Sequence, residues 1–309
     1  MDRPTDTEYR RAPHVAAMVT LCGLFPLLFV GAGVTSKGAG MAYPDWPTSG
    51  GYLANPPGWW SVESTRWEHG HRLIGWGVGL SALALAVLTW NRGSPQRGLG
   101  LGTFVAIGLQ GVLGGIRVIG DSIALAMVHG IWGQACFCLA ALTALITSHS
   151  WAALGPPLAF RSSRVLAHLC MAATGVIFLQ LILGATLRHF ASDYALVAHV
   201  LWAIPVLFLN GWAVMAVLGQ GFGVRLLDRI AQTTGLLLVI QLALGGFAWL
   251  VGLAGNQWAP WLAWLVPSLH VAVGALLLGS AVLLLVIVCR KLYPFGQPNE
   301  RMSVEAAAS

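Results

Sequence analysis

The chain contains eight apolar runs of about 20 residues, and this feature limits its fold more than any other. A helix of that length crosses a hydrocarbon core of about 30 Å, and only helices or closed barrels satisfy all their backbone hydrogen bonds inside lipid. The content of 57% hydrophobic and 9% charged residues excludes an ordinary soluble domain. We therefore predict an all-α membrane protein with eight transmembrane helices. The predicted spans are residues 15–35, 70–90, 98–118, 123–147, 165–187, 194–218, 230–252 and 264–289.

The sequence repeats one four-helix pattern twice. A Gln-x-x-Leu-Gly-Gly motif occurs in the third helix of each copy, at 110–115 and 241–246, and a related Gln180-Leu-Ile-Leu-Gly-Ala185 lies near the end of the fifth apolar run. Each copy has an even number of spans, so both cross the membrane in the same sense. This predicts two tandem four-helix bundles related by a pseudo-twofold axis along the membrane normal. The predicted parts are an N-terminal half, a cytoplasmic linker, and a C-terminal half with a short tail: residues 1–148, 149–164 and 165–309.

Charge and composition predict the orientation. Twelve of the seventeen Lys and Arg residues fall on the side that holds both chain ends. Because such residues favour cytoplasmic loops, we expect a cytoplasmic (inner) membrane protein with both termini in the cytoplasm and no cleaved signal peptide. The net charge of +6 follows from this bias, so nucleic acid is not an expected partner. No disulfide is expected. The Gly/Pro/Trp-rich outer loop 36–67 fits either a structured lid or an aromatic belt at the membrane surface.

Each copy contributes one pair of histidines, His71 with His129 and His199 with His270. An imidazole inside a membrane span is costly unless its nitrogens have partners. Haem iron accepts an axial imidazole on each face, and a four-helix bundle can hold the macrocycle between its helices. The pairs therefore favour two haem sites in the outer half of the bilayer. The alternative is that a hydroxyl or carbonyl group satisfies each histidine. The remaining histidines are interpreted as surface or hydrogen-bonded residues without a ligand role: His14, His69, His149, His168 and His189.

The two copies differ beside these pairs. Glu68 precedes His71 by three residues and shares its helical face, whereas the corresponding residue of the second copy is Leu196. A carboxylate there could take up protons or stabilise positive charge on a substrate. The difference favours a reaction centre in the first half and an electron-transfer haem in the second. An interfacial salt bridge from Glu68 to Arg66 or Arg72 is the alternative.

Arginines and glutamines are further candidates for these sites. Arg72, Arg117 and Arg188 stand at the outer ends of helices, where they could bind haem propionates through bidentate hydrogen bonds or simply extend to the interface. Gln110 and Gln241 could hydrogen-bond across helices, and their neighbouring glycines allow close packing.

The motif Glu68-His-Gly-His-Arg72, the Gln-x-x-Leu-Gly-Gly repeats, the histidine pairs and the loop Gly38-Ala-Gly-Met-Ala-Tyr-Pro-Asp-Trp-Pro-Thr48 resemble the haem A synthase family over residues 15–290. The resemblance implies a membrane enzyme that oxidises the C8 methyl group of haem O to a formyl group in two successive steps. It implies that His71 and His129 hold the substrate haem and that His199 and His270 hold a haem B cofactor for electron transfer. Glu68 would be the catalytic carboxylate.

The resemblance also implies partners: haem O synthase, a farnesyltransferase, and the assembly of a terminal oxidase, with a homo-oligomer left open. One subtype of the family has a cysteine pair in an outer loop; loop 36–67 has no cysteine, so a mechanism that needs this pair is excluded. Two other function classes remain. One is a di-haem b-type cytochrome that exchanges electrons with quinol, and the other is a haem carrier or chaperone for oxidase assembly.

Overall fold

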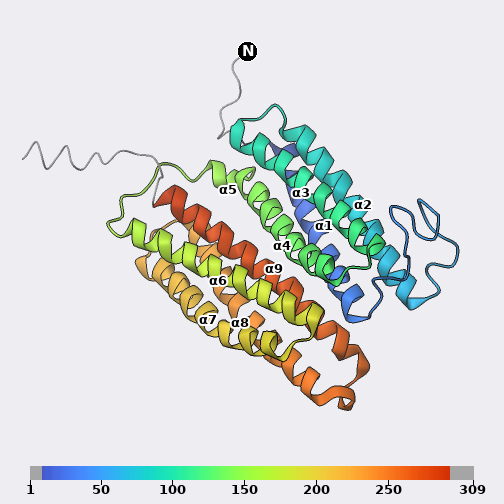
Figure 1. The fold of residues 1–309 in the computed structure, drawn as a ribbon. Helices are drawn as coiled ribbons and strands as arrows, with labels where there is room; N and C mark the ends of the chain where they lie inside the picture. The colour runs from blue at the N-terminus through green and yellow to red at the C-terminus, as the bar shows by residue number, and fades with distance from the viewer. Residues whose placement is uncertain (1–8, 293–309) are drawn as a thin grey trace, which may run out of the picture.

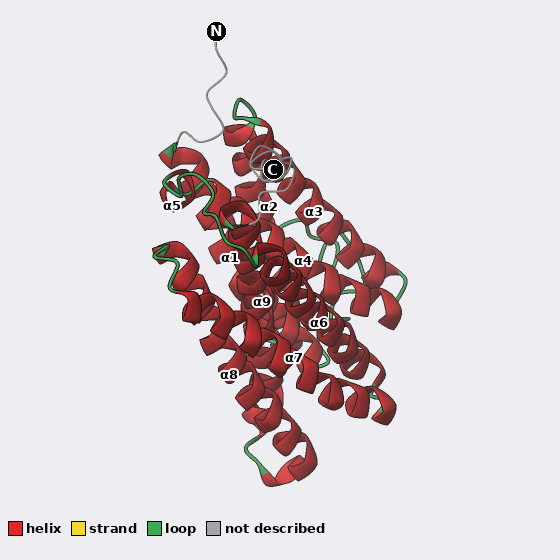
Figure 2. Cartoon of the chain, turned by 90° about the vertical axis from the view of Figure 1, so that its left-hand side faces the viewer, coloured by secondary structure: helices red, strands yellow, loops and turns green. Residues whose placement is uncertain are grey.

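The computed structural model describes residues 9–292, which form long helices joined mostly by short connections (Figure 2). No strand element is present within this range. The long helices are α1 Arg11–Ser36, α2 Glu63–Thr89, α3 Ser94–Ile119, α4 Ile123–Ile146, α6 Ser163–Phe190, α7 Asp193–Gln220, α8 Arg225–Ala254 and α9 Pro260–Lys291. A short helix, α5 His149–Ala152, lies between α4 and α6, and a 3₁₀ turn, Gly255–Gln257, lies between α8 and α9.

These eight long helices are each long and apolar enough to cross a membrane, which confirms the predicted number of spans for the described residues. The largest difference from the prediction is at α2, which begins at Glu63 and not near residue 70. The first two turns are too polar to belong to an apolar run, but a helix satisfies its own backbone wherever it lies. Glu63 pairs there with Lys37 at 2.6 Å. The outer loop therefore covers residues 37–62, and Glu68 lies inside a helix.

The helices pack as two sets of four. In the first set α1 contacts α2, α2 contacts α3, α3 contacts α4, and α4 returns to α1. The contacts among α6, α7, α8 and α9 follow the same order and also close. The sets meet where α1 and α4 contact α9 and where α4 contacts α6 (Figure 1). The pseudo-twofold axis and the exact boundaries of the halves stay predictions.

The two ends of the molecule differ. Helix α1 begins at the end that also holds α5 and the end of α9, and loop 37–62 lies at the opposite end (Figure 1). At the α5 end, Lys291 of α9 is buried and donates hydrogen bonds to the carbonyl oxygens of Leu154 and Pro156, which fastens the linker to the last helix. We call this the linker end and the other the loop end.

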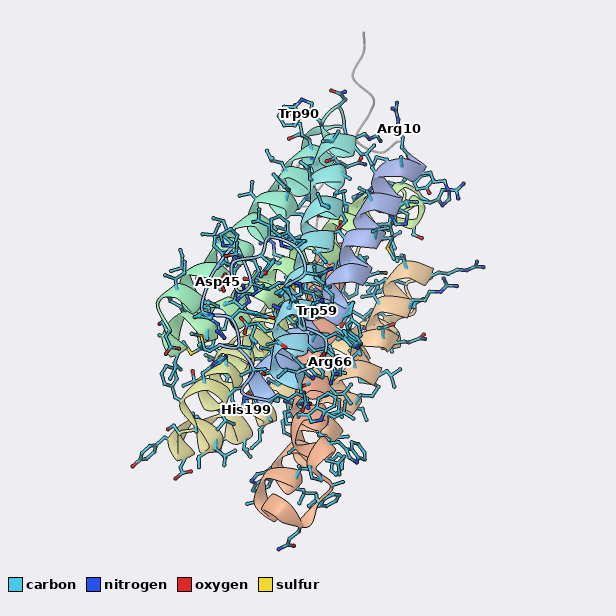
Figure 3. The ribbon with its side chains drawn as sticks, turned by 90° about the vertical axis from the view of Figure 1, so that its right-hand side faces the viewer. Arg10, Asp45, Trp59, Arg66, Trp90 and His199 are labelled. Atoms are coloured by element: carbon cyan, nitrogen blue, oxygen red, sulfur yellow. The ribbon has the colours of Figure 1, made fainter. Side chains whose placement is uncertain are left out.

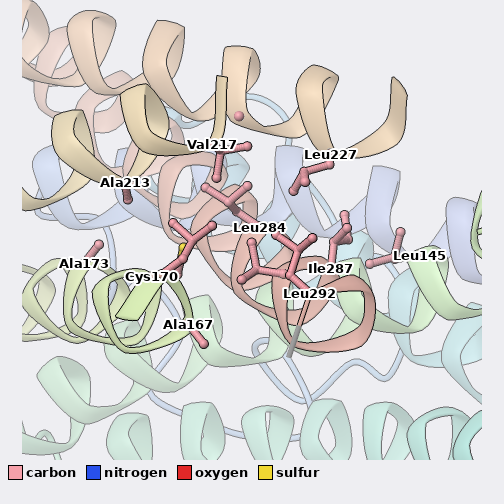
Figure 4. Close-up of a cluster of buried hydrophobic side chains, with 13 residues drawn as sticks. Leu145, Ala167, Cys170, Ala173, Ala213, Val217, Leu227, Leu284, Ile287 and Leu292 are labelled. Atoms are coloured by element: carbon pink, nitrogen blue, oxygen red, sulfur yellow. The ribbon is translucent and has the colours of Figure 1, made fainter. Parts of the chain in front are cut away.

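The largest hydrophobic cluster lies at the linker end of the second half, where α6, α7, α8 and α9 meet Leu145 of α4 (Figure 4). Its fully buried members include Ala167, Val217, Leu227 and Ile287. These buried side chains hold the four helices of the second half together at this end. The paired histidines lie toward the loop end, outside this cluster.

At the loop end the halves are joined by polar contacts. Arg188 of α6 donates to the carbonyl oxygen of Ala32 at 2.5 Å and to the hydroxyl of Ser36 at 2.7 Å, both in α1. The hydroxyls of Ser36 and Ser268 of α9 are 3.4 Å apart. These contacts tie the first half to both α6 and α9.

Candidate functional site

The fold brings together the histidines that the repeat pairs. His71 of α2 faces His129 of α4 with ring centroids 6.4 Å apart, and His199 of α7 faces His270 of α9 at 6.2 Å. The planes of the two rings make angles of 71° and 82°. Within each set of four, every helix contacts its neighbours in the chain and the first contacts the fourth. The second and fourth helices, which carry the histidines, therefore lie on opposite sides of the set. Each set therefore holds one facing pair of imidazoles near its loop end.

The spacing of each pair fits one iron held between two imidazoles. An imidazole nitrogen binds a first-row metal ion at about 2.0–2.1 Å, and the ring centre lies about 1.1 Å behind it, so two axial imidazoles have centres about 6.3 Å apart. The described residues contain no group of three or more His, Cys, Asp or Glu side chains that could hold a metal ion. A porphyrin would supply the equatorial ligands that two imidazoles leave open.

Buried nitrogens support the same interpretation. The Nδ1 atoms of His129, His199 and His270 are buried without a hydrogen-bond partner in the described part of the chain. A buried polar group without a partner costs about 1–3 kcal/mol. A metal or another ligand would relieve that cost, so the donor set fits haem.

Each histidine rests on a glycine of the preceding helix. A Cβ atom added to that glycine would lie 2.8–3.0 Å from an atom of the imidazole ring in all four cases. The glycine and histidine pairs are Gly31 with His71, Gly114 with His129, Gly184 with His199, and Gly245 with His270. Carbon atoms normally stay about 3.5 Å apart or more, so a side chain there would displace the ring. The repeated Gln-Gly motif had indicated close packing, and the partner it accommodates is the imidazole.

Three of the four histidines also contact a glutamine. The Nε2 atoms of Gln110, Gln180 and Gln241 lie 3.3, 3.4 and 3.3 Å from Nε2 of their histidines. Gln110 and Gln180 also donate to the carbonyl oxygen of the same histidine, at 3.0 and 2.9 Å. Gln180 was not among the candidate residues, although its motif had been noticed; its position relative to His199 is visible only once α6 and α7 pack.

Glu68 is buried beside the first pair, with 4% of its surface exposed. Its Oε1 pairs with Nη2 of Arg72 at 2.5 Å, and its Oε2 accepts a hydrogen bond from the backbone of Tyr43 at 3.1 Å. The salt bridge to Arg72 that the sequence left open is therefore present. Arg66 instead donates to the carbonyl oxygen of Trp60. The carboxylate thus connects helix α2 to the outer loop.

The outer loop is folded onto the first half. Arg72 donates to the carbonyl oxygens of Asp45, Thr48 and Tyr43 at 2.8, 2.6 and 3.0 Å. The ring of Trp46 packs against Gly115 of α3, next to the glycine that seats His129. Asp45 and Trp59 of the loop lie toward the loop end, far from Arg10 and Trp90 at the other end (Figure 3). The loop is therefore structured, and its roles as a lid or as an aromatic belt at the membrane surface stay predictions.

Asp45 organises the turn of this loop. Its carboxylate accepts hydrogen bonds from the hydroxyl of Thr48 at 2.5 Å and from the backbone N–H groups of Gly50 and Gly51 at 2.7 and 2.9 Å. Burial opposes ionisation, but these hydrogen bonds prevail and lower the pKa of Asp45 to about 2. The loop is therefore held by a carboxylate that stays ionised well below neutral pH.

The sequence had placed His69 at the outer surface. This is wrong, because loop 37–62 covers it. It is 3% exposed, and its ring nitrogens lie 3.0 Å from the hydroxyl of Ser49 and 3.1 Å from Oδ1 of Asn55. Its ring also packs against Trp59. These contacts agree with the prediction that His69 is hydrogen-bonded, and the absence of a ligand role stays a prediction.

The three arginines proposed as propionate partners all donate to protein carbonyl groups. Arg72 binds the loop and Arg188 binds α1, as described above, and Arg117 of α3 donates to the carbonyl oxygen of Gly40 at 2.8 Å. An arginine has five N–H donors, so these bonds do not exhaust it. The arginines hold the loop and the contact between halves, and a propionate role stays a prediction.

The second half lacks the features that surround Glu68. Its first two helices, α6 and α7, are joined only by residues 191–192, where the first half has loop 37–62. Leu196 stands one helical turn before His199, at the place of Glu68. The two histidine pairs therefore have similar geometry, but the residues around them differ.

Residues 60–196 match the family model described as cytochrome oxidase assembly protein (COX15-CtaA). The matched segment includes Glu68 and the first histidine pair, and the second pair lies beyond it. The search of curated proteins found no match.

Proposed function

We propose that this membrane protein is a haem A synthase, because residues 60–196 match the model of the cytochrome oxidase assembly protein family, which is the haem A synthase family. It would oxidise the C8 methyl group of haem O to a formyl group in two successive steps. One observation carries the proposal: two histidine pairs of nearly equal spacing, of which only one lies beside a buried carboxylate and under a folded loop.

The proposal assigns a role to each pair. His71 and His129 would hold the substrate haem O, because Glu68 and the loop belong to that half. His199 and His270 would hold haem B. When bound, haem B would supply a one-electron carrier for electrons removed from the substrate. The apolar Leu196 beside this second pair offers no proton acceptor, which suits electron transfer.

Glu68 would handle the protons of the reaction. With water as the oxygen donor, each oxidation adds one hydroxyl group to the methyl carbon and removes two electrons and two protons. The last intermediate, a hydrated aldehyde, loses one water to give the formyl group. A carboxylate has about four lone-pair positions, and Arg72 and Tyr43 occupy two of them. The remaining positions can accept a proton or stabilise positive charge that develops on the substrate. Arg72 and Tyr43 would keep the carboxylate in one orientation.

The family assignment and the eight spans support a multi-pass membrane protein of oxidase assembly. We further propose the cytoplasmic (inner) membrane, with the linker end and both termini in the cytoplasm and the histidine pairs near the outer face. Haem O synthase would supply the substrate, and a terminal oxidase would receive the product.

Substitution of Glu68 tests the assignment. In Glu68→Gln and Glu68→Ala proteins, loss of proton transfer should lower haem A formation by about 100-fold or more. Both haem sites should stay loaded, and haem O or its alcohol should accumulate in extracted pigments measured by mass spectrometry. The matched control is Glu63→Gln, which removes an exposed carboxylate of the same helix.

A second control separates chemistry from loop damage. Asp45→Asn disturbs the turn that Glu68 also helps to hold but leaves the carboxylate of Glu68 in place. If Glu68→Ala makes haem A at the parent rate, the catalytic assignment is wrong. If only haem B is extracted from both sites of the parent protein, a di-haem cytochrome explains the protein better.

A further inference from the structure

We call the residues of the preceding helix that contact each paired histidine its seat, and the four seats differ in one polar residue. In α3, α6 and α8 a glutamine stands one helical turn before the glycine that contacts the histidine ring: Gln110, Gln180 and Gln241. In α1 the glycine is Gly31, and the residue one turn before it is Leu27. His71 is therefore the one paired histidine of the described chain whose seat has no amide.

Leu27 occupies the place that the glutamines occupy elsewhere. A Cβ atom added to Gly133, one turn after His129, would lie 2.9 Å from Nε2 of Gln110, and the equivalent Gly274 gives 3.1 Å to Gln241. The equivalent residue after His71 is Gly75, and its added Cβ would lie 4.0 Å from Cδ1 of Leu27. A glycine one turn after the histidine thus makes room for the glutamine amide beside His129 and His270, and for Leu27 beside His71.

The glutamine amides suit the second nitrogen of a metal-bound imidazole. A histidine that binds a metal through one nitrogen carries its proton on the other, and this N–H is usually held by an acceptor that fixes the ring. The Oε1 atoms of all three glutamines are buried without a hydrogen-bond partner in the described residues. Oε1 is therefore the free acceptor of each amide, and the amide atom beside the ring in the structure is Nε2. A half-turn of the amide group exchanges these two atoms and would bring the acceptor to the ring nitrogen. Nε2 of Gln110 and Gln180 also donates to the carbonyl oxygen of the same histidine.

We propose that Gln110, Gln180 and Gln241 are positioning residues for their histidines, and that Leu27 makes His71 the displaceable ligand of the first site. The inference rests on the proposed function, in which this site must take up a substrate and release a product while the second site keeps its haem. One ligand of the first site, His129, is oriented by an amide, and the other is not. In the second site both ligands are oriented.

Loss of such an outer hydrogen bond lowers metal affinity by about 10- to 100-fold. The first site should therefore exchange haem faster than the second by about that factor. Leu27→Gln adds the missing amide and should slow exchange at the first site by about 10-fold or more. Leu27→Met is the matched control, because it keeps an apolar side chain of similar length. Gln180→Met should produce the opposite change in the second site.

The experiment uses the full-length protein in lipid nanodiscs, loaded with haem B. Transfer of haem to excess apomyoglobin is followed in the Soret band, and the visible spectrum reports whether the iron has two imidazole ligands. The parent protein should lose haem in a fast and a slow phase. Leu27→Gln should slow the fast phase and increase the share of iron with two imidazoles, Leu27→Met should leave both unchanged, and Gln180→Met should accelerate the slow phase.

The outcomes separate this inference from the proposed function. Equal exchange by both sites, or identical behaviour of Leu27→Gln and Leu27→Met, would overturn the inference and leave the proposed function intact. If haem leaves in the predicted fast and slow phases but the protein makes no haem A, the difference between the ligands is supported and the proposed synthase function is overturned. A protein without any Soret absorbance would overturn both.

Discussion

A single added methyl group should loosen the second haem site if the glycine seats work as described. Gly245 of α8 packs on the ring of His270, and a Cβ atom at this position would lie 3.0 Å from Cε1. The next residue, Gly246, has no atom within 4 Å of an added Cβ. Gly245→Ala and Gly246→Ala are therefore the same chemical change on neighbouring residues, with and without the contact.

The magnitude follows from this geometry. Carbon atoms in contact stay about 3.5–4.0 Å apart, so the ring of His270 must move by about 0.5–1 Å in the Gly245→Ala protein. Such overpacking costs about 1–3 kcal/mol. Both alanines also gain about 0.8–1 kcal/mol of helix propensity, which cancels in the comparison. Haem should thus bind the second site about 5- to 150-fold more weakly in Gly245→Ala than in Gly246→Ala.

Haem content per polypeptide and the rate of haem loss to apomyoglobin measure this difference, and circular dichroism in detergent confirms that both variants keep their helices. Gly245→Ala should lose the haem of the slow phase, and Gly246→Ala should match the parent. Equal haem retention by the two variants, with both folded, would refute the conclusion that this glycine sets the position of His270.

Three other outcomes are expected. Arg188→Met removes the donors that bind α1, including Ser36, and should lower the thermal midpoint in detergent, since each buried acceptor left unpaired costs about 1–3 kcal/mol. Lys291→Met frees two carbonyl groups of the linker, including Pro156, and limited proteolysis should then cut the linker faster while haem content stays unchanged. Because the pKa of Asp45 is lowered from 3.8 to about 2, its stabilisation of the loop is complete above about pH 4 and is lost as the pH falls toward 2. Tryptophan fluorescence of the loop should change as the pH falls toward 2. The Asp45→Asn protein should show the fluorescence of the acid form already at neutral pH.

The two halves hold their histidine pairs in nearly the same geometry and surround them with different side chains. The spacing of the histidine pairs differs by only 0.2 Å between 6.4 and 6.2 Å. The differences lie around the pairs: a carboxylate, a folded loop and a missing amide, all beside His71. Under the proposed function, each of these features would favour haem exchange or chemistry in the first half, and their absence would favour permanent binding in the second.

Several features were predictable because they depend on local sequence. The length of the apolar runs predicted eight spans, and their regular repetition predicted which histidines face each other. The start of α2 was predicted about seven residues too late, because a hydropathy pattern ends where polar residues begin, whereas the helix continues through Glu63 and Arg66. Burial of His69 was missed for a related reason: a loop of the same chain covers it.

The sequence by itself determined the membrane class, the number of spans and the residues that form the two pairs. These depend on the free energy of placing each side chain in lipid and on helical periodicity, which are local properties. The tertiary structure alone decided which side chains contact these residues: Arg72 and Tyr43 on Glu68, a glycine under each imidazole, and Leu27 where the other seats have glutamine. Such contacts join helices far apart in the chain, so they exist only after the helices have packed.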